Sequence, residues 1–251
     1  MPVHATVRPG YDRWKTRATM SRHTRPTDPS IEITLRRSKA ARRFSLRVSR
    51  IDGAVTLSMP FHARDAEALG FAAGQADWLR RALARARPAE CVGIGAVLPV
   101  EGVALTVTAA PVRAVRAEGG ALLVPEDAER VGARVAAYLK LRARQRLQAE
   151  SERHAATLGR PFARITLRDV RSRWGSCARD GSLMYSWRLI LAPPEVLSYV
   201  AAHEVAHLAE MNHSARFWTV VARLMPEYER HRRWLKAHGT GLHAYDFGAR
   251  E

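Results

Sequence analysis

The sequence is poor in cysteine and acidic residues and has no long apolar run. Cys91 and Cys177 are its two cysteines among 251 residues, which excludes a disulfide framework like that of small secreted proteins. No apolar stretch approaches the roughly 20 residues that a membrane-spanning helix needs. The N-terminus also lacks the apolar segment of a secretory signal. We therefore expect a cytoplasmic protein without a membrane partner.

The shortage of acidic residues leaves a large positive charge. The chain has 41 Lys and Arg against 24 Asp and Glu, a formal net charge of +17, and residues 1–50 hold 13 of the bases but 3 of the acids. Such an excess favours polyanions, so association of DNA with this basic surface is one hypothesis. Basic residues also solubilise tails, however, and the sequence lacks a recognised nucleic-acid-binding motif.

The first half of the chain predicts a small β-rich unit. Residues 1–29 are polar, basic and turn-rich, which predicts a disordered basic tail. Alternation of apolar and polar residues then predicts half-buried antiparallel strands at 31–35, 44–48 and 55–59, with a hairpin turn at 51–53. The other elements predicted are a helix over 63–87 and short strands near 96–100, 103–108, 112–117 and 121–124.

Two histidines in the second half carry the strongest chemical signal. His203-Glu204-Val-Ala-His207 has the pattern HExxH, inside a helix predicted to begin near Pro194 and to end around Met211 and Asn212. Residues four apart share one helix face, so both imidazoles can reach one Zn²⁺ at roughly 2.0–2.1 Å. Glu204 lies beside the first ligand, where it can accept a proton from activated water. The alternative is that the two histidines are only core or solvent-exposed residues of an amphipathic helix. The helical context of the motif disfavours this alternative.

A catalytic zinc site needs a third protein ligand and one open position. His213 follows the predicted end of the helix, and a short turn can bring it back toward the metal. Glu227 and Glu229 are the alternative ligands, because other metallopeptidases use a glutamate from a later helix. We favour His213.

Longer stretches around the motif point to one family. They are Arg171-Ser-Arg-Trp-Gly-Ser-Cys177, Ser186-Trp-Arg-Leu-Ile-Leu-Ala-Pro193, Tyr199-Val-Ala-Ala-His-Glu-Val-Ala-His-Leu208 and Asn212-His-Ser-Ala-Arg-Phe-Trp218. Together they resemble the YgjP-like metallopeptidases, relatives of the SprT-like zincin proteases, with weaker similarity over 31–80. The resemblance implies a zinc-dependent hydrolase of proteins or peptides with one Zn²⁺ per chain. It also implies His203, His207 and His213 as ligands and Glu204 as general base.

The same resemblance suggests a substrate-binding segment. In zincin-like proteins an edge strand beside the catalytic helix pairs with extended peptide. The candidate residues for this cleft wall are Arg173, Trp174, Gly175, Ser176 and Cys177. Packing within a sheet is an equally weighted alternative for them. Cys177 has no activating partner nearby in sequence, which favours a structural thiol over a nucleophile. Candidates for stabilising an oxyanion are Tyr199, His231, Tyr245 and Arg173.

Together these features predict an α+β protein in three parts. A disordered basic tail (1–29) precedes a β-rich subdomain with one helix (30–124) and a zincin-like metallopeptidase catalytic domain (125–251). The catalytic domain is predicted to contain a long helix, a short antiparallel sheet, the HExxH helix and C-terminal helices. Their predicted bounds are 125–158 for the long helix, 164–169 and 183–191 for the strands, and 215–225 for the first C-terminal helix.

The leading functional hypothesis is a zinc-dependent metallopeptidase that hydrolyses peptide bonds. SprT-like relatives degrade proteins crosslinked to DNA, which with the basic charge makes a DNA-associated protease of that type one alternative. A second alternative is a non-catalytic, nucleic-acid-associated zinc protein, although a structural site does not need Glu204 as a base. A zinc hydrolase of small amides is the third.

Overall fold

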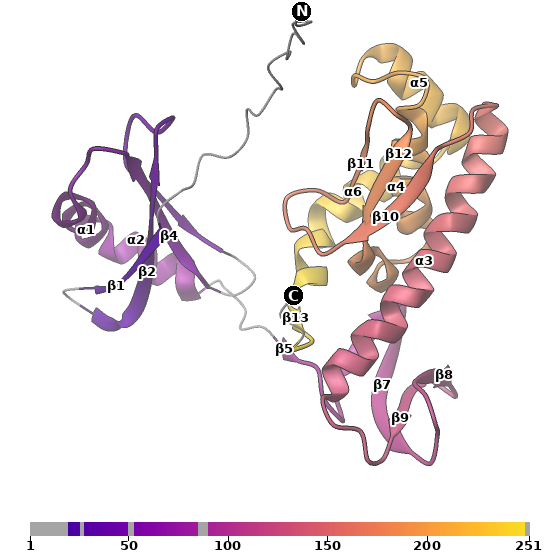
Figure 1. Ribbon diagram of the computed structural model, residues 1–251, viewed down its shortest axis with the longest axis horizontal. Coiled ribbons are helices and arrows are strands. Elements are labelled where there is room, and N and C mark those ends of the chain that lie inside the picture. Colours follow the sequence, from indigo (N-terminus) through magenta and orange to yellow (C-terminus); the bar gives the residue numbers. More distant parts are fainter. Residues whose placement is uncertain (1–19, 26–27, 50–52, 85–89, 249–251) are drawn as a thin grey trace, which may run out of the picture. The chain divides into compact units, whose positions relative to one another are not determined.

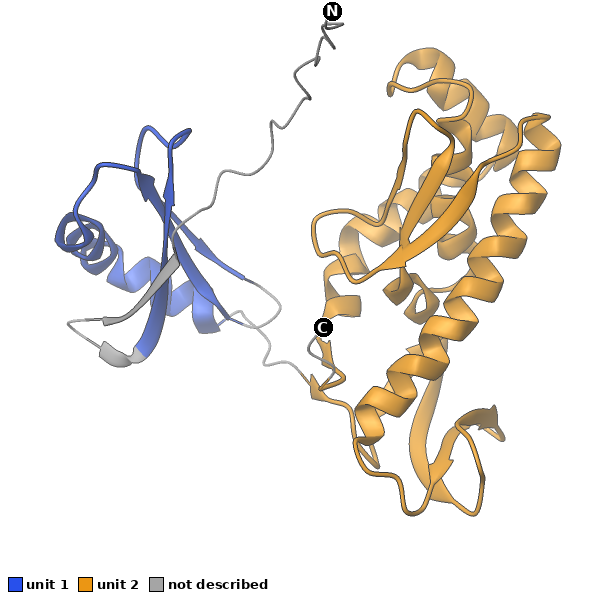
Figure 2. Ribbon diagram, in the orientation of Figure 1, with its two compact units in different colours: residues 1–87 blue, residues 88–251 orange. Residues whose placement is uncertain are grey.

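The protein, described here by a computed structural model, divides into two compact units, residues 1–87 and 88–251 (Figure 2). The structure describes residues 20–25, 28–49, 53–84 and 90–248. Positions 1–19 of the predicted tail, and 51 and 52 of the predicted hairpin turn, lie outside these ranges. The boundary that we predicted between residues 124 and 125 falls inside the second unit. The reason is that strands before it share one hydrophobic core with the helices after it.

Part of the predicted tail is a strand. Residues Met20–Arg25 form β1, which pairs antiparallel with β2 (Asp28–Ser38). The sequence of β1, Met-Ser-Arg-His-Thr-Arg, has no apolar alternation from which a strand could be predicted. The strand instead arises from backbone hydrogen bonds to the neighbouring β2, which no side-chain pattern reports.

The first unit is a four-stranded sheet with two helices (Figure 1). Its strand order is β1-β2-β4-β3, and β2 runs parallel to β4, not antiparallel as predicted, because β4 returns between β2 and β3. The single helix predicted over 63–87 is two helices, since α1 ends at Gly74 and Gln75. The remaining elements are β3 (Ser45–Val48), β4 (Val55–Pro60), α1 (Asp65–Gly74) and α2 (Ala76–Ala84). Alternate residues form its core: Ile31, Ile33 and Leu35 of β2, and Val55, Leu57 and Met59 of β4.

The second unit has a larger core and contains the candidate site. In chain order its elements are β5 (Glu90–Cys91), β6 (Val97–Val100), β7 (Val103–Ala110), β8 (Arg116–Glu118), β9 (Ala121–Pro125), α3 (Val131–Leu158), β10 (Arg164–Arg168), β11 (Gly175–Cys177), β12 (Ser182–Ser186), the 3₁₀ helix η1 (Trp187–Leu191), α4 (Pro194–Ala206), α5 (Ala215–Leu224), α6 (Tyr228–His238), the 3₁₀ helix η2 (Gly239–His243) and β13 (Tyr245–Asp246). The sheet β6-β7-β9-β8 contributes Leu98, Val107 and Leu122 to the same buried cluster as α3.

The long helix α3 runs along the second unit (Figure 1). Val135, Leu139, Ala143 and Leu147 recur every four residues and are buried, which gives the helix one apolar stripe. It begins later than predicted because the preceding residues belong to β9 and a turn. It ends as predicted at Gly159, whose φ of 74° is the left-handed cap conformation that glycine adopts readily. Within the described residues, no helix combines the length and the apolar character needed to cross a membrane.

The second sheet lies next to the HExxH helix. Its order is β10-β12-β11, and it is mixed, not antiparallel as predicted, since β10 runs parallel to β12. The strand predicted over 183–191 ends at Ser186, and the segment that follows, apolar except for Arg188, forms η1. All of η1 is buried, and periodicity cannot separate a short buried strand from a short buried helix.

Arg188 of η1 connects this core to the C-terminal segment. Its guanidinium donates hydrogen bonds to both carboxylate oxygens of Asp169, at 2.7 and 3.1 Å. It also donates to the carbonyl oxygens of Leu242 and Tyr245, at 3.2 and 3.0 Å. Burial raises the pKa of Asp169, but the hydrogen bonds and charge of Arg188 outweigh burial and hold that pKa below its usual value. This partly buried ion pair therefore holds the C-terminal segment beside the β10-β12-β11 sheet.

Replacing Arg188 by Met is expected to lower the free energy of unfolding by about 3 kcal/mol, because Asp169 and two carbonyl oxygens lose their donors. The pKa of Asp169 is lowered in the folded state, so this stabilisation is present above the pKa of an unfolded aspartate, about 3.9. It is lost as the pH falls through the lower folded-state value. Urea unfolding at neutral and at strongly acidic pH measures both effects.

The matched control for Arg188 is Arg168→Met, which changes an exposed arginine of β10. We expect this control to change stability by less than about 0.5 kcal/mol. The role given to the ion pair would be contradicted if both variants lost the same free energy of unfolding. It would also be contradicted if the difference in free energy of unfolding between R188M and the wild type were the same in acid as at neutral pH.

Candidate metal centre

Helix α4 carries His203 and Glu204 and is buried along most of its length. Pro194 stands at its first position, where a proline needs no hydrogen-bond partner. The helix was predicted to continue to about residue 212, but it ends at Ala206, and tight turns occupy the next residues. His207 is thus the capping residue of α4, one turn beyond His203, and the chain turns back directly after it.

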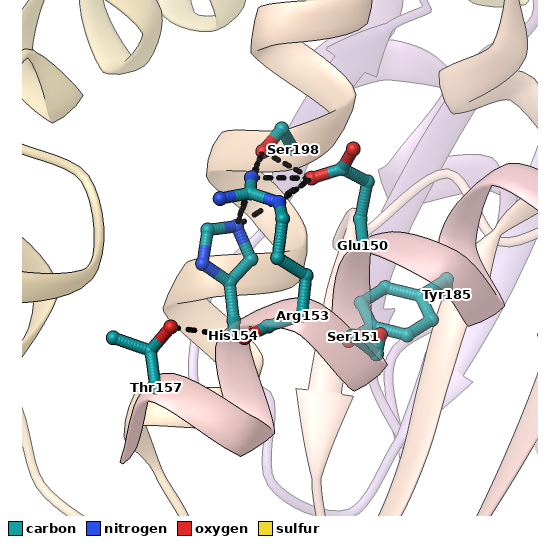
Figure 3. A network of polar contacts seen from close by, with 7 residues as sticks. All are labelled: Glu150, Ser151, Arg153, His154, Thr157, Tyr185 and Ser198. Atoms are coloured by element: carbon teal, nitrogen blue, oxygen red, sulfur yellow. Dashed lines mark hydrogen bonds and ion pairs between the residues drawn. The ribbon is translucent and has the colours of Figure 1, made fainter.

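Polar contacts join α4 to α3 (Figure 3). The Ser198 hydroxyl of α4 donates to Glu150 at 2.7 Å, accepts from Arg153 at 3.0 Å and lies 3.1 Å from His154 Nε2. Burial, with the charge of Arg153, lowers the pKa of His154 to about 4, so its imidazole is neutral at pH 7. Because these contacts link adjacent turns of α3 to one residue of α4, they fix the position of the HExxH helix on the core.

The structure brings the three predicted histidines together. One ring nitrogen from each of His203, His207 and His213 lies within 4.8 Å of the other two, and the Nε2 atoms of His203 and His213 are 3.0 Å apart. The fully buried ring of Phe217 contacts all three. Its centroid lies 4.9 Å from that of His203, 4.5 Å from that of His207 and 4.8 Å from that of His213.

The protonation of these imidazoles fits a bound cation. The carbonyl oxygen of Glu210 can only accept, so His207 donates through Nδ1, at 3.0 Å, and its Nε2 keeps a free lone pair. Burial, followed by the charges of His207, His213 and Arg232, lowers the pKa of His203 to about 3. The buried Nδ1 of His203 has no hydrogen-bond partner among the described residues. A cluster of neutral, nitrogen-bearing ligands is the donor set that suits a divalent transition metal.

The short segment between α4 and α5 positions His213. Ser214 caps α5 by accepting a hydrogen bond from the Phe217 amide at 3.4 Å, and Asn212 accepts one from the Ser214 amide at 3.3 Å. The alternative ligands are directed elsewhere. Glu227 and Glu229 are exposed on or next to α6, and among the described residues the group that could hold a metal consists of the three histidines.

Glu204 lies directly against the segment predicted as the cleft wall. A Cβ atom placed on Gly175 of β11 would lie 2.5 Å from Oε1 and 2.6 Å from Cγ of Glu204, so the close contact requires glycine there. Burial raises the pKa of Glu204 to about 8, and the positive charge of Arg173 opposes this rise. The backbone of β11 and the carboxylate from α4 therefore meet at the residue that follows His203.

The other predicted wall residues have different surroundings. Trp174 stacks on His243 with ring centroids 4.9 Å apart, which ties it to the C-terminal segment. Ser176 and Cys177 are half-buried, and burial together with the charge of Glu204 raises the pKa of the Cys177 thiol to about 11. A protonated thiol of this kind is a poor nucleophile.

The candidates for oxyanion stabilisation are dispersed. The ring of Tyr199 lies 6.0 Å from that of His203, one turn earlier on α4. His231 is buried in α6, whereas Tyr245 belongs to β13, which pairs with β5. Sequence reasoning did not find Arg232, which approaches the site from α6. An exposed arginine within a run of basic residues has no pattern that separates it from its neighbours.

Comparisons with known proteins give one structural similarity and one family match. The crystal structure of the metallopeptidase zymogen of Pyrococcus abyssi abylysin is similar to the chain, with 19% sequence identity and a TM-score of 0.34. The similarity covers 36% of this chain and 93% of that chain. No curated protein gives a significant match. The model of the YgjP-like metallopeptidase domain matches residues 42–238, a span that contains the three histidines and Glu204, and the chain therefore belongs to the YgjP-like metallopeptidase family.

Proposed function

We propose that this metallopeptidase is zinc-dependent, with His203, His207 and His213 as the metal ligands and Glu204 as the general base. The observation that supports this most is the convergence of three ring nitrogens within 4.8 Å, together with the burial of Glu204, the residue that follows His203 on α4. Three neutral nitrogen ligands leave one position of a tetrahedral zinc free, as catalytic zinc sites require. Among common biological cations, zinc suits this imidazole set best.

The residues of the chain divide the chemistry between them. A zinc ion held by three protein ligands supplies Lewis acidity, which activates water and polarises a carbonyl group. Glu204 takes the proton from the attacking water and delivers it to the leaving amine nitrogen. Gly175 lets the backbone of β11 approach the Glu204 carboxylate, and Phe217 holds the three imidazoles in place. Glu210 fixes the tautomer of His207 through its carbonyl oxygen.

We place an extended peptide substrate along β11. This strand is at the edge of its sheet, where β12 is its one neighbour among the described strands, so its outer backbone groups are available for pairing. The contact between Gly175 and Glu204 supports this placement, because it sets the strand beside the proposed base. Arg173, Trp174, Gly175, Ser176 and Cys177 then border the substrate.

Glu204→Gln is expected to retain zinc and to lower kcat at least about 1,000-fold, because the amide cannot accept the proton of water. Metal analysis of the purified protein and cleavage of a casein or quenched peptide substrate measure the two effects. Glu195→Gln, an exposed change on the same helix, serves as the control and should cleave normally. Turnover by E204Q at the wild-type rate would refute the assignment of the base.

His213→Ala is expected to weaken zinc binding by more than about 100-fold, since loss of a ligand should exceed the 10–100-fold effect of losing a residue that only supports one. Competition with a chromophoric chelator measures the affinity. Glu227→Gln and Glu229→Gln should bind zinc as the wild type does. Normal affinity in H213A together with a loss in either glutamate variant would transfer the third ligand to that glutamate.

Gly175→Ala is expected to lower kcat about 100-fold, because the new methyl group displaces the Glu204 carboxylate from its position. Zinc affinity should stay at the wild-type value, since no histidine moves. Gly93→Ala is the matched control, as a Cβ there meets no atom within 4 Å. Unchanged kcat in G175A, or loss of zinc in parallel with activity, would show that Gly175 does not position the base.

A further inference from the structure

We propose that Arg232 binds a carboxylate of the substrate, so that the site prefers peptides with a negative charge near the scissile bond. The inference rests on the proposed peptidase site and adds a substrate class to it. Arg232 lies on α6, outside the HExxH helix, β11 and the loop of His213. Arg232 would thus select substrates, whereas residues of the other elements would carry the chemistry.

The position of Arg232 follows from a chain of ring contacts. Its guanidinium carbon lies 4.5 Å from the ring centroid of Trp218. The Trp218 ring in turn lies 5.8 Å from that of His203 and 5.9 Å from that of His213. The guanidinium and the two imidazoles are therefore neighbours of the same indole ring. A substrate carbonyl at the metal and a carboxylate one or two residues away could occupy the two positions together.

The aromatic contact also limits the freedom of the arginine. Tyr228, one turn before Arg232 on α6, stacks on Trp218 with ring centroids 5.4 Å apart and an interplanar angle of 20°. Trp218 is thereby held against α6, and Arg232 lies on a fixed ring. A guanidinium restrained in this way loses less conformational entropy when it binds a ligand, and its planar fork matches a carboxylate.

Within the part of the chain that the structure describes, Arg232 has no acidic partner. Among the described residues it forms no ion pair, whereas Arg230 on the same helix pairs with Glu227, and Arg142 and Arg146 of α3 pair with Glu101. Arg232 is also exposed, so a ligand can reach it. An exposed, restrained and unpaired arginine beside a hydrolytic site can bind an anion without first breaking a protein contact.

A carboxylate could come from the C-terminus of a peptide or from an acidic side chain, and matched peptides distinguish these sources. One pair differs by a free or an amidated C-terminus, and the other by Asp or Asn next to the scissile bond. In the zinc-loaded full-length protein, Arg232→Gln is expected to raise KM about 10- to 100-fold for the charged member of one pair. The uncharged members should keep their KM and kcat within about twofold.

Two further variants sharpen the test. Arg232→Lys keeps the charge without the fork and should fall between wild type and R232Q. Arg233→Gln removes the adjacent exposed arginine and should leave every peptide unaffected. Equal effects of R232Q on charged and uncharged members, or no effect on either, would overturn the proposal.

Binding without turnover separates this inference from the proposed mechanism. In E204Q, calorimetric titration with the charged peptide should give a Kd about 10- to 100-fold lower than in the E204Q/R232Q double variant. If E204Q still cleaves peptides but this difference appears, the assignment of the base fails and that of Arg232 stands. If E204Q is inactive and the two Kd values are equal, the carboxylate site fails and the base stands.

Discussion

The enclosure of α4 by the rest of the second unit is the constraint on which the site depends. Two of the proposed metal ligands lie one turn apart on this helix and its cap, with the proposed base between them, so any rotation of the helix would move all three together. Apolar packing against α3 resists displacement, and the Ser198 contacts with Glu150 and His154 add directional bonds that resist rotation. Phe217, which belongs to the next helix, α5, contacts all three imidazoles.

The same enclosure makes the site electrostatically costly. Burial lowers the pKa of His203 and raises that of Glu204, and both shifts favour the uncharged form. The pKa of the imidazole falls and the pKa of the carboxyl group rises, which identifies loss of hydration as the main cause. A single nearby charge would instead shift both pKa values in the same direction. Such unfavourable burial is tolerated where function needs it and where the surrounding fold is stable enough, as the large core of this unit allows.

The sequence predicted the local parts of the candidate site, and the family resemblance placed residues 173–177 beside the catalytic helix, but neither predicted the individual tertiary contacts. His203, Glu204 and His207 follow from helical periodicity, and His213 follows from a turn of a few residues. The contact of Gly175 with Glu204, and the ion pair of Arg188, join segments far apart in the chain. Strand β1 went undetected because backbone pairing forms it, and the domain boundary was displaced because a shared core leaves no mark in local composition.

The large net positive charge can affect the site only through those basic residues that lie close to it. Exposed charges act over about 10 Å at ordinary ionic strength, so most of the 41 basic residues have little effect on a substrate at the histidines. The charge of Arg173, in the segment before β11, lowers the pKa of Glu204, and the charge of Arg232 of α6 lowers the pKa of His203. The positive charges of these two arginines add to the charge of a bound divalent cation. A peptide that carries a carboxylate would lower this local positive charge. In the proposed function the chemistry of hydrolysis would reside in α4 and the segment that follows it, whereas the preference for acidic substrates would reside in Arg232 of α6.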